Sequence, residues 1–269
     1  MKFHHNRYTG SAMLSVIFMA FGVVGASAQD FCRGYGPQSP RDISQNAGAN
    51  GQLFTPAPPS ESMNLCNIHS HTNAEHKGPG FEVFAGKGPH GGYQCTETPN
   101  LTASELKNPN TGHGGYAGIK PGDTIEVHWV YSSCKVTPGE GLGSCLSDSC
   151  ANPELRVETQ VFLVVNDPDA LNFNDFAYAG NTVDGRPQPL TLPADTGTPI
   201  VYAGSTTGSK YSQAQCSPLQ VTWSVRPNCA KIDIASLNAW ADAGNVFKED
   251  HSHEVRGLVT NPDLLAPIE

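Results

Sequence analysis

Five stretches of the chain carry the pattern of apolar and polar residues that β-strands show. In four of them apolar and polar side chains alternate and β-branched or aromatic residues are frequent, which is typical of strands that bury one face. These four are residues 124–131 (TIEVHWVY), 157–165 (VETQVFLVV), 200–203 (IVYA) and 219–225 (LQVTWSV). Residues 64–71 (NLCNIHSH) are a shorter candidate strand.

The segments between these strands are rich in Gly, Pro, Asn and Ser. Residues 78–92, 108–122 and 138–153 are therefore predicted to be loops. Helices are expected at only two places, residues 237–243 and the region close to the C-terminus. No linker-like segment separates two cores. The sequence thus predicts a single domain of the mainly β (α+β) class, built on a large twisted, mostly antiparallel sheet with few short helices.

The N-terminal residues have the pattern of an export signal. Lys2 and Arg7 give a basic start, residues 12–26 are apolar, and Ala26-Ser27-Ala28 supplies the small residues that precede signal cleavage. The apolar run is shorter than the roughly 20 residues of a membrane span, and an uncleaved anchor is the alternative. We expect a signal peptide at 1–28 and a domain at 29–269 that is periplasmic or secreted, without stable membrane insertion.

Composition narrows the classes of function. The formal net charge of −9 lacks the basic footprint of nucleic-acid binders, so no nucleic-acid partner is expected. Charged residues make up 15% of the chain, against an average of roughly 25%. Such a chain is too low in charge for a long coiled coil, and its apolar and aromatic content is too high for wholesale disorder.

Eight cysteines, all after the predicted signal peptide, fit an oxidising compartment. An even number in an exported chain predicts up to four disulfides, and the pairing is open. A thiolate metal site would need pairs of cysteines two residues apart, and this spacing does not occur twice. Disulfides are therefore favoured over metal thiolates for these residues: Cys32, Cys66, Cys95, Cys134, Cys145, Cys150, Cys216 and Cys229.

The histidines carry the candidate chemistry. His69 and His71 are two residues apart, which on a strand places both imidazoles on one face. His128 lies in the clearest strand, with Glu126 on the same face two positions earlier. If the two strands are neighbours, three imidazoles converge as in a catalytic zinc site, and Glu126 accepts the second ring N–H of His128. Surface or structurally satisfied histidines are the alternative.

A family resemblance adds to this. Residues 66–80 (CNIHSHTNAEHKGPG) resemble the signature of delta-class carbonic anhydrases. Further fragments are similar to alpha-class phrases and follow the same order. They are residues 38–43 (QSPRDI), His69-Ser70-His71, Ala74-Glu75-His76, residues 126–129 (EVHW), and residues 202–207 (YAGSTT) followed by Cys216 and residues 221–225 (VTWSV). The HxH-to-SEH gap is shorter than in the alpha class and the LTTPP element is altered, which favours the delta class.

The resemblance implies a fold like that of alpha carbonic anhydrases and a zinc ion, or Co²⁺ or Cd²⁺ in its place, held by His69, His71 and His128. It implies reversible hydration of CO2 to bicarbonate and a proton by zinc-bound hydroxide. It nominates Glu75 as the carboxylate that orients a hydroxyl. That hydroxyl belongs to Thr207 in an ungapped comparison and to Thr206 if one residue is missing.

Three further expectations come from the same resemblance. Val130 and Trp223 occupy the positions that line the CO2 pocket, although plain core packing is the alternative for each. Cys32 and Cys216 are implied to form a disulfide. A partly exposed histidine is needed to export the proton, and the sequence leaves the choice open between His76, His90, His113, His251 and His253.

Two other functions are compatible with the residues. The spacing His69-x-His71-xxx-Glu75 and the turn at residues 121–123 (PGD) match a cupin-like metalloenzyme, in which Glu75 and His128 complete an iron or manganese site. The glycine expected six residues before His69 is replaced by Met63. The third hypothesis is an exported, non-catalytic metal- or carbohydrate-binding module.

Overall fold

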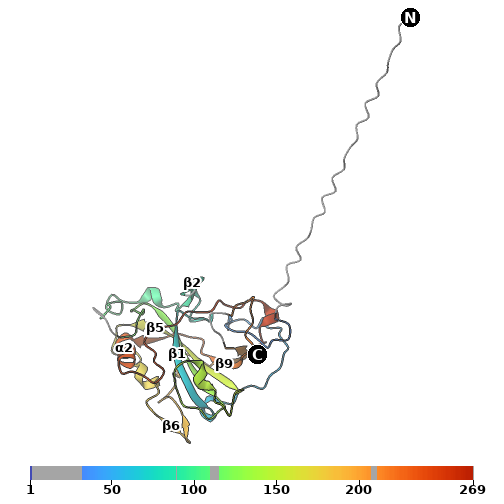
Figure 1. The fold of residues 1–269 in the computed structure, drawn as a ribbon. Coiled ribbons are helices and arrows are strands. Elements are labelled where there is room, and N and C mark those ends of the chain that lie inside the picture. The colour runs from blue at the N-terminus through green and yellow to red at the C-terminus, as the bar shows by residue number, and fades with distance from the viewer. Residues whose placement is uncertain (2–31, 89, 110–114, 207–210, 269) are drawn as a thin grey trace.

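The structure, a computed structural model, describes residue 1 and residues 32–88, 90–109, 115–206 and 211–268 (Figure 1). Within these residues strands dominate and one α-helix is present. The strands are β1 (Asn64–Thr72), β2 (Val83–Gly86), β3 (Gly92–Gln94), β4 (Thr124–Ser132), β5 (Leu155–Val165), β6 (Thr182–Val183), β7 (Arg186–Pro187), β8 (Ile200–Ser205), β9 (Gln220–Val225) and β10 (Ala230–Asp233). The helix is α2 (Ile234–Asp242), and short 3-10 turns are η1 (Ser60–Ser62), η2 (Thr98–Asn100), η3 (Leu142–Cys145), η4 (Phe173–Phe176) and η5 (Pro262–Leu264).

A mixed sheet of six strands forms the centre of the described structure. Its order is β1-β4-β5-β9-β8, and β10 pairs with the second half of β5. The β1–β4, β4–β5 and β8–β9 pairs are antiparallel, whereas β9 and β10 both run parallel to β5. Most pairings are therefore antiparallel, as predicted. The long strand β5 accepts two parallel neighbours because each pairs with a different part of its length.

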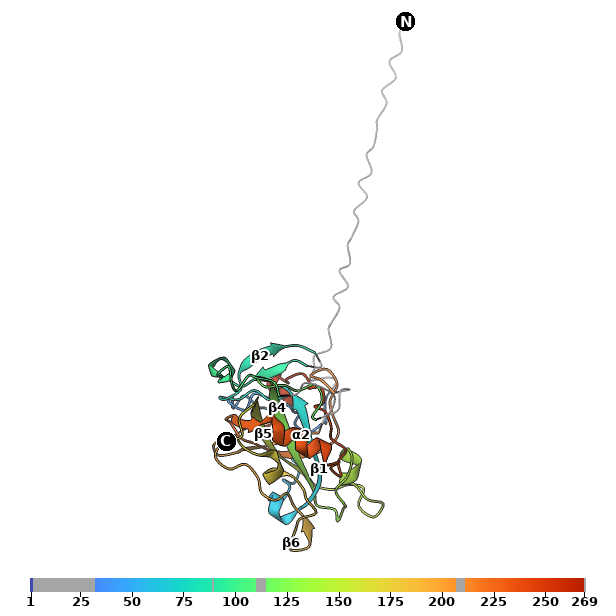
Figure 2. The same ribbon diagram turned by 90° about the vertical axis from the view of Figure 1, so that its left-hand side faces the viewer.

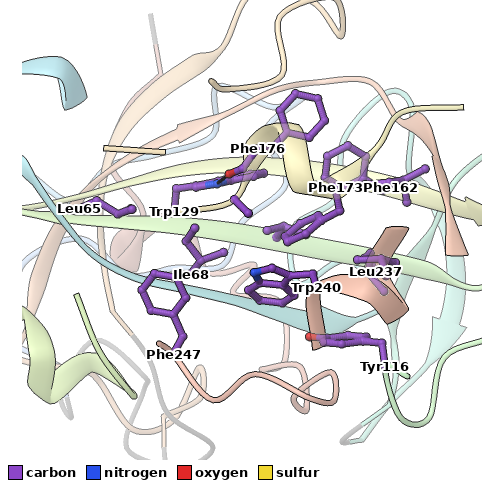
Figure 3. Packing of buried hydrophobic residues seen from close by; sticks show 14 of the residues in the cluster. Leu65, Ile68, Tyr116, Trp129, Phe162, Phe173, Phe176, Leu237, Trp240 and Phe247 are labelled. Atoms are coloured by element: carbon purple, nitrogen blue, oxygen red, sulfur yellow. Dashed lines mark hydrogen bonds between the residues drawn. The ribbon is translucent and has the colours of Figure 1, made fainter. Parts of the chain in front are cut away.

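Helix α2 covers one face of this sheet, as Figures 1 and 2 show. Ile234, Leu237 and Trp240 recur every three residues and are all buried, so one side of the short helix meets the sheet. In the core, Trp240 packs on Phe173 with ring centroids 4.6 Å apart (Figure 3). Alternate residues of β4, including Trp129, point into this cluster. Because strand side chains alternate between faces, the intervening residues of β4 point to the opposite face.

The opposite face of the sheet holds a second buried cluster. Val130, Val157 and Trp223 lie directly across from one another on β4, β5 and β9 and form a row on this face. All nine residues of β4 are buried, which is the pattern of a central strand covered on both sides. The histidines predicted to bind metal lie on this second face, beside the row.

Four disulfides link the described residues, and none of the described cysteines is free. The pairs are Cys32–Cys216, Cys66–Cys145, Cys95–Cys229 and Cys134–Cys150. The first pair is the one that the family resemblance implied. The other three connect the loops around the sheet, and residue spacing alone had left them open.

Comparison with the expected elements shows where local pattern was sufficient. All five expected strands are present, with ends that differ by up to two residues. The helix expected at 237–243 begins earlier, at Ile234, and the helix expected near the C-terminus is only the short 3-10 turn η5. The prediction that residues 78–92 form only a loop was wrong, because β2 and β3 pair there as an antiparallel hairpin.

The N-terminal prediction concerns residues that the structure does not describe. The expected signal peptide, residues 1–28, lies almost wholly in the undescribed segment 2–31. Among the described residues, no helix has the length and apolar character needed to cross a bilayer.

Candidate metal centre

The register of two neighbouring strands brings three histidines together. On the antiparallel pair β1–β4, His69 lies directly opposite His128, and His71 lies opposite Glu126. The ring centroids are 5.0 Å apart for His69 and His128, 4.8 Å for His71 and His128, and 5.1 Å for His69 and His71. One nitrogen from each ring lies within 4.8 Å of the other two. The expected convergence is thus present in the fold.

A hydrogen bond sets the protonation of the His69 ring. Its Nδ1 atom lies 2.6 Å from Oδ1 of Asn67, and the amide nitrogen of Asn67 donates to the carbonyl of Gly139 at 3.0 Å. The second contact assigns the amide orientation, so Oδ1 is the atom that faces the ring. Because this oxygen only accepts, Nδ1 of His69 carries the proton and Nε2 presents a lone pair.

A backbone carbonyl does the same for His71. Its Nδ1 atom lies 2.8 Å from the carbonyl oxygen of Glu254, which only accepts hydrogen bonds. The proton is therefore on Nδ1, and Nε2 presents its lone pair. The segment that carries this carbonyl runs beside β1, where the His253 N–H donates to the Ser70 carbonyl at 2.8 Å.

A buried chain of side chains fixes the third ring. Oε1 of Glu126 lies 2.6 Å from Nε2 of His128 and 2.7 Å from Nδ1 of His76, and both ring nitrogens donate to it. Nε2 of His76 then accepts from the hydroxyl of Tyr202 at 2.6 Å. Burial alone would raise the pKa of Glu126, but its contacts with His76 and His128 hold that pKa well below the usual value. Nδ1 of His128 is left with a lone pair.

The three tautomers have a common consequence. Nε2 of His69 lies 3.2 Å from Nδ1 of His128, and each of these nitrogens presents a lone pair to the other. Burial lowers the pKa of both rings, and the neighbouring histidines lower that of His69 further, so protonation is disfavoured there. Neutral imidazoles with converging lone pairs and outer N–H groups bound to oxygen are the donor set of a metal centre. The residues therefore fit a metal ion.

A small cavity adjoins the three histidines on the apolar side. It has a volume of about 40 Å³ and is lined by His69, His71, His128, Val130, Leu142, Val157, Thr206 and Trp223. A water molecule needs roughly 10–15 Å³ measured in this way, so the space holds a molecule of a few atoms. Val130 and Trp223 line this cavity and also pack in the core, and their role as a CO2 pocket stays a prediction.

Glu75 lies beside this centre but not within the group of converging ligand atoms. It is 2% exposed, its Oε1 accepts the backbone N–H of Arg256 at 2.9 Å, and it lies 3.7 Å from Nδ1 of His71. That ring nitrogen is the one turned away from the other histidines. The cupin-like ligand set, which needs Glu75 on the metal, therefore does not match this arrangement.

The hydroxyl partner of Glu75 is only partly described. Thr207 lies outside the described residues. Thr206 is 5% exposed, and its backbone N–H donates to the carbonyl of Leu219 at 2.8 Å. Among the described residues no hydrogen bond joins the Thr206 hydroxyl to Glu75, so the role expected for these two threonines stays a prediction.

A larger cavity opens from the histidines towards the surface. Its volume is about 530 Å³. Its lining includes His69, His71, Glu75, Glu140, Glu249, His251, His253, Glu254 and Arg256. Arg256 is 5% exposed, and its Nε and Nη2 atoms have no hydrogen-bond partner among the described residues. Burial lowers the pKa of Arg256 to about 10, although the nearby negative charge of Glu75 raises it. The guanidinium thus stays charged near neutral pH.

The candidate proton-exporting histidines differ in where they lie. His76 is completely buried and held between Glu126 and Tyr202, so it is not a partly exposed group. His90 is exposed but does not line either cavity beside the three histidines. His113 lies outside the described residues. Of the described candidates, only His251 and His253 line the large cavity.

Sequence reasoning missed several residues that build the centre. Asn67 precedes His69 by two positions and so shares its face of β1, which is a signal that the spacing offered. Tyr202 lies inside the YAGS phrase, but nothing local pairs it with His76. Glu254 contributes only its backbone carbonyl, so its side chain carries no signal. Arg256 reaches Glu75 across 181 residues of sequence.

The fold and the site together define the class of protein: a mainly β protein with three converging histidines, two buried and one partly exposed, arranged as a metal centre on the face of a mixed sheet. A sequence model of the family described as Delta carbonic anhydrase matches residues 60–236. The chain therefore belongs to the delta carbonic anhydrase family. No curated protein sequence matches the chain. Family membership supports carbonic anhydrase activity and a metal in this site.

Proposed function

We propose that this protein is an exported zinc carbonic anhydrase that converts CO2 and water reversibly to bicarbonate and a proton. Membership of the delta carbonic anhydrase family supports the reaction. The donor set supports zinc, since catalytic zinc sites use three protein ligands and keep one position open. Co²⁺ or Cd²⁺ would use the same three nitrogens. Four disulfides support export to an oxidising compartment.

One distance carries the metal assignment. The lone pairs of Nε2 in His69 and Nδ1 in His128 face each other at 3.2 Å. Two bare lone pairs at this distance repel, and a shared cation removes the repulsion. Nitrogens bound tetrahedrally at 2.0–2.1 Å are separated by about 3.3 Å, so the rings already stand at the spacing that zinc needs.

The chain's own residues account for most of the mechanism. A zinc ion held by the three nitrogens would supply one thing, the lowering of the pKa of a water molecule to about 7. The small cavity, walled by Val130, Val157 and Trp223, admits an uncharged triatomic substrate and offers little to a charged product. Glu126 holds the His128 ring in the tautomer and orientation that the reaction needs.

Glu75 has a positioning role in this proposal. Its carboxylate is buried at the wall of the large cavity and fixed by the backbone N–H of Arg256. A carboxylate only accepts hydrogen bonds, so it would orient the hydroxyl of Thr207, or of Thr206, with the oxygen lone pair turned to the reacting atoms. His251 and His253 line the route by which the proton leaves.

The test combines metal analysis with stopped-flow CO2 hydration. We expect one tightly bound zinc per chain at the three histidines together with fast hydration, and loss of this zinc and of hydration in His128→Ala. His90→Ala is the matched control, because His90 is exposed and lines neither cavity. Absence of hydration by the zinc-loaded protein would contradict the proposal. Redox-active iron with oxygen consumption would favour the cupin-like metalloenzyme instead.

A further inference from the structure

A second pair of histidines lines the large cavity, with the spacing of the first. The side chains of His251 and His253 are 56% and 41% exposed, so they lie at its mouth, where the cavity opens to solvent. His251 and His253 are two residues apart on an extended segment, and their ring centroids are 5.0 Å apart. The centroids of His69 and His71 are 5.1 Å apart. The second pair is held in place by backbone pairing, since His253 forms a bridge with His71 and His251 forms one with Ala117.

A buried carboxylate faces this second pair. The Glu249 side chain is 7% exposed, and both of its oxygens lie 3.0 Å from Nε2 of His253. Its place is fixed by Asn245, whose Oδ1 accepts the Glu249 N–H at 3.0 Å and whose amide donates to the Glu249 carbonyl at 2.8 Å. Nitrogen and oxygen ligands of one tetrahedral zinc ion at 2.0–2.2 Å lie about 3.3–3.6 Å apart, so a movement of a few tenths of an ångström converts this hydrogen-bonded pair into two ligands.

His251 has the tautomer of a metal ligand. Its Nδ1 atom lies 2.6 Å from Oδ1 of Asp250, so the proton is on Nδ1 and Nε2 presents a lone pair. Metal-binding histidines commonly donate their other N–H to a carboxylate in this way, as His128 does to Glu126. The ligand atoms of His251, His253 and Glu249 do not all lie within 4.8 Å of one another, so His251 must rotate to complete the site. Its side chain is 56% exposed, which leaves it room to do so.

The charges around the mouth favour a cation. Glu140, Glu249 and Glu254 all line the cavity. The two basic residues of the lining have other carboxylates beside them, since Lys248 pairs with Glu140 at 2.8 Å and Arg256 lies beside Glu75. Negative groups around a concave opening raise the local concentration of cations.

We propose that His251, His253 and Glu249 form a second divalent-metal site at the mouth of the cavity. Two imidazoles and one carboxylate are a donor set that zinc accepts, and Zn²⁺ is therefore the cation expected there. His253 is not one of the residues whose ligand atoms converge at the first site, although its ring centroid lies only 5.9 Å from that of His69. A cation bound there stands over the opening that leads to them.

This position has a regulatory consequence, which rests on the proposed carbonic anhydrase function. Occupation of the second site narrows the path to the first, so hydration slows as a second equivalent of Zn²⁺ binds. The site itself does not depend on that function. A protein that binds two zinc ions without hydrating CO2 would contradict the proposed function and leave the second site standing.

The binding test uses the full exported chain loaded with one equivalent of Zn²⁺ and titrated calorimetrically with further Zn²⁺, with equilibrium dialysis and elemental analysis for stoichiometry. Wild-type protein binds two equivalents. His251→Ala keeps the first equivalent and weakens the second at least about 10-fold. His128→Ala loses the first and keeps the second. Glu249→Gln weakens only the second, and the exposed-histidine control His90→Ala keeps both.

Two results would overturn the proposal. One is a wild-type chain that binds a single equivalent. The other is a His251→Ala protein that binds its second equivalent with wild-type affinity. Thermal unfolding of each metal-free variant is measured alongside, and we expect no change for His251→Ala because that side chain is mostly exposed.

Discussion

Nδ1 of His76 donates to Oε1 of Glu126 across 2.7 Å, although neither residue is one of the three converging histidines. The backbone N–H of His76 donates to the other oxygen of the same carboxylate at 3.1 Å. Glu126 is thus held from one side while it accepts the N–H of His128 on the other. This arrangement makes the carboxylate a rigid support for a metal-binding ring, and it leads to the first two predictions.

Replacing Glu126 by Gln should weaken zinc binding roughly 10- to 100-fold, the usual cost of losing a carboxylate behind a metal-binding histidine. The amide can donate where the carboxylate only accepts, so it no longer enforces the tautomer of His128. Competition with a chelator measures the affinity. Glu158→Gln is the matched control, since Glu158 is on the neighbouring strand and pairs with Arg156. Equal affinity in Glu126→Gln and wild type would show that the support is unimportant.

Tyr202→Phe tests the far end of the same chain. It removes the hydroxyl that donates to Nε2 of His76 and leaves that buried nitrogen without a partner. An unmet buried acceptor costs about 1–3 kcal/mol, so the free energy of unfolding should fall by that amount. Urea denaturation of the metal-free protein measures it. Tyr35→Phe, at a site that is 38% exposed, should change nothing. A stable Tyr202→Phe protein would refute the assigned bond.

Glu75→Gln separates a positioning role from a ligand role. Glu75 lies outside the group of converging ligand atoms, so the variant should bind zinc with unchanged stoichiometry. Turnover should fall roughly 10- to 100-fold, because a neutral amide orients a hydroxyl less specifically than a carboxylate does. Elemental analysis and stopped-flow hydration give the two readouts. Loss of the metal would instead place Glu75 among the ligands.

Acid sensitivity should come in part from a surface ion pair far from the centre. The Lys231 ammonium, 2.6 Å from Glu105, and the N–H and hydroxyl of Thr102 lower the pKa of Glu105 from 4.5 to about 2. Between pH 5 and 2 the folded protein binds fewer protons at this group than the unfolded chain. Its stabilising contribution is therefore complete above about pH 4.5 and is lost as the pH falls towards 2.

The measurement is urea denaturation at several pH values between 2 and 6. Glu105→Gln should show a shallower loss of stability over this range than wild type, and Lys231→Met should lie between the two because the Thr102 contacts remain. Identical pH profiles for Glu105→Gln and wild type would exclude this ion pair as a source of acid sensitivity.

Local pattern predicted the parts of the fold in which each residue's environment repeats. The alternation in residues 124–131 predicted β4, and the spacing of His69, His71 and His128 predicted three rings on facing positions of two strands. By contrast, β10 went unrecognised, because it is four residues long and is stabilised by pairing with a distant part of β5. The hairpin of β2 and β3 was hidden by its glycines, which favour a turn or loop by local criteria.

The disulfides show the same limit of prediction from local sequence pattern. Eight cysteines in a chain with a predicted export signal predicted disulfide bonds, but only the family resemblance favoured a particular pair. Cys95 and Cys229 are separated by 134 residues, and Cys66 and Cys145 by 79. Such pairings follow from how the loops pack around the sheet, which residue spacing does not encode.

The sequence by itself predicted the strand pattern, the disulfide-bonded state of the cysteines and the choice of three candidate metal-binding histidines. These predictions rest on residue types and on their spacing within short segments of the chain. Only the tertiary structure decided which nitrogen of each ring is free. That choice depends on acceptors from elsewhere, notably the side chain of Asn67, the carbonyl of Glu254 and the carboxylate of Glu126. It also brought a second histidine pair beside the first, since the segment that carries it hydrogen-bonds to β1 from about 180 residues away.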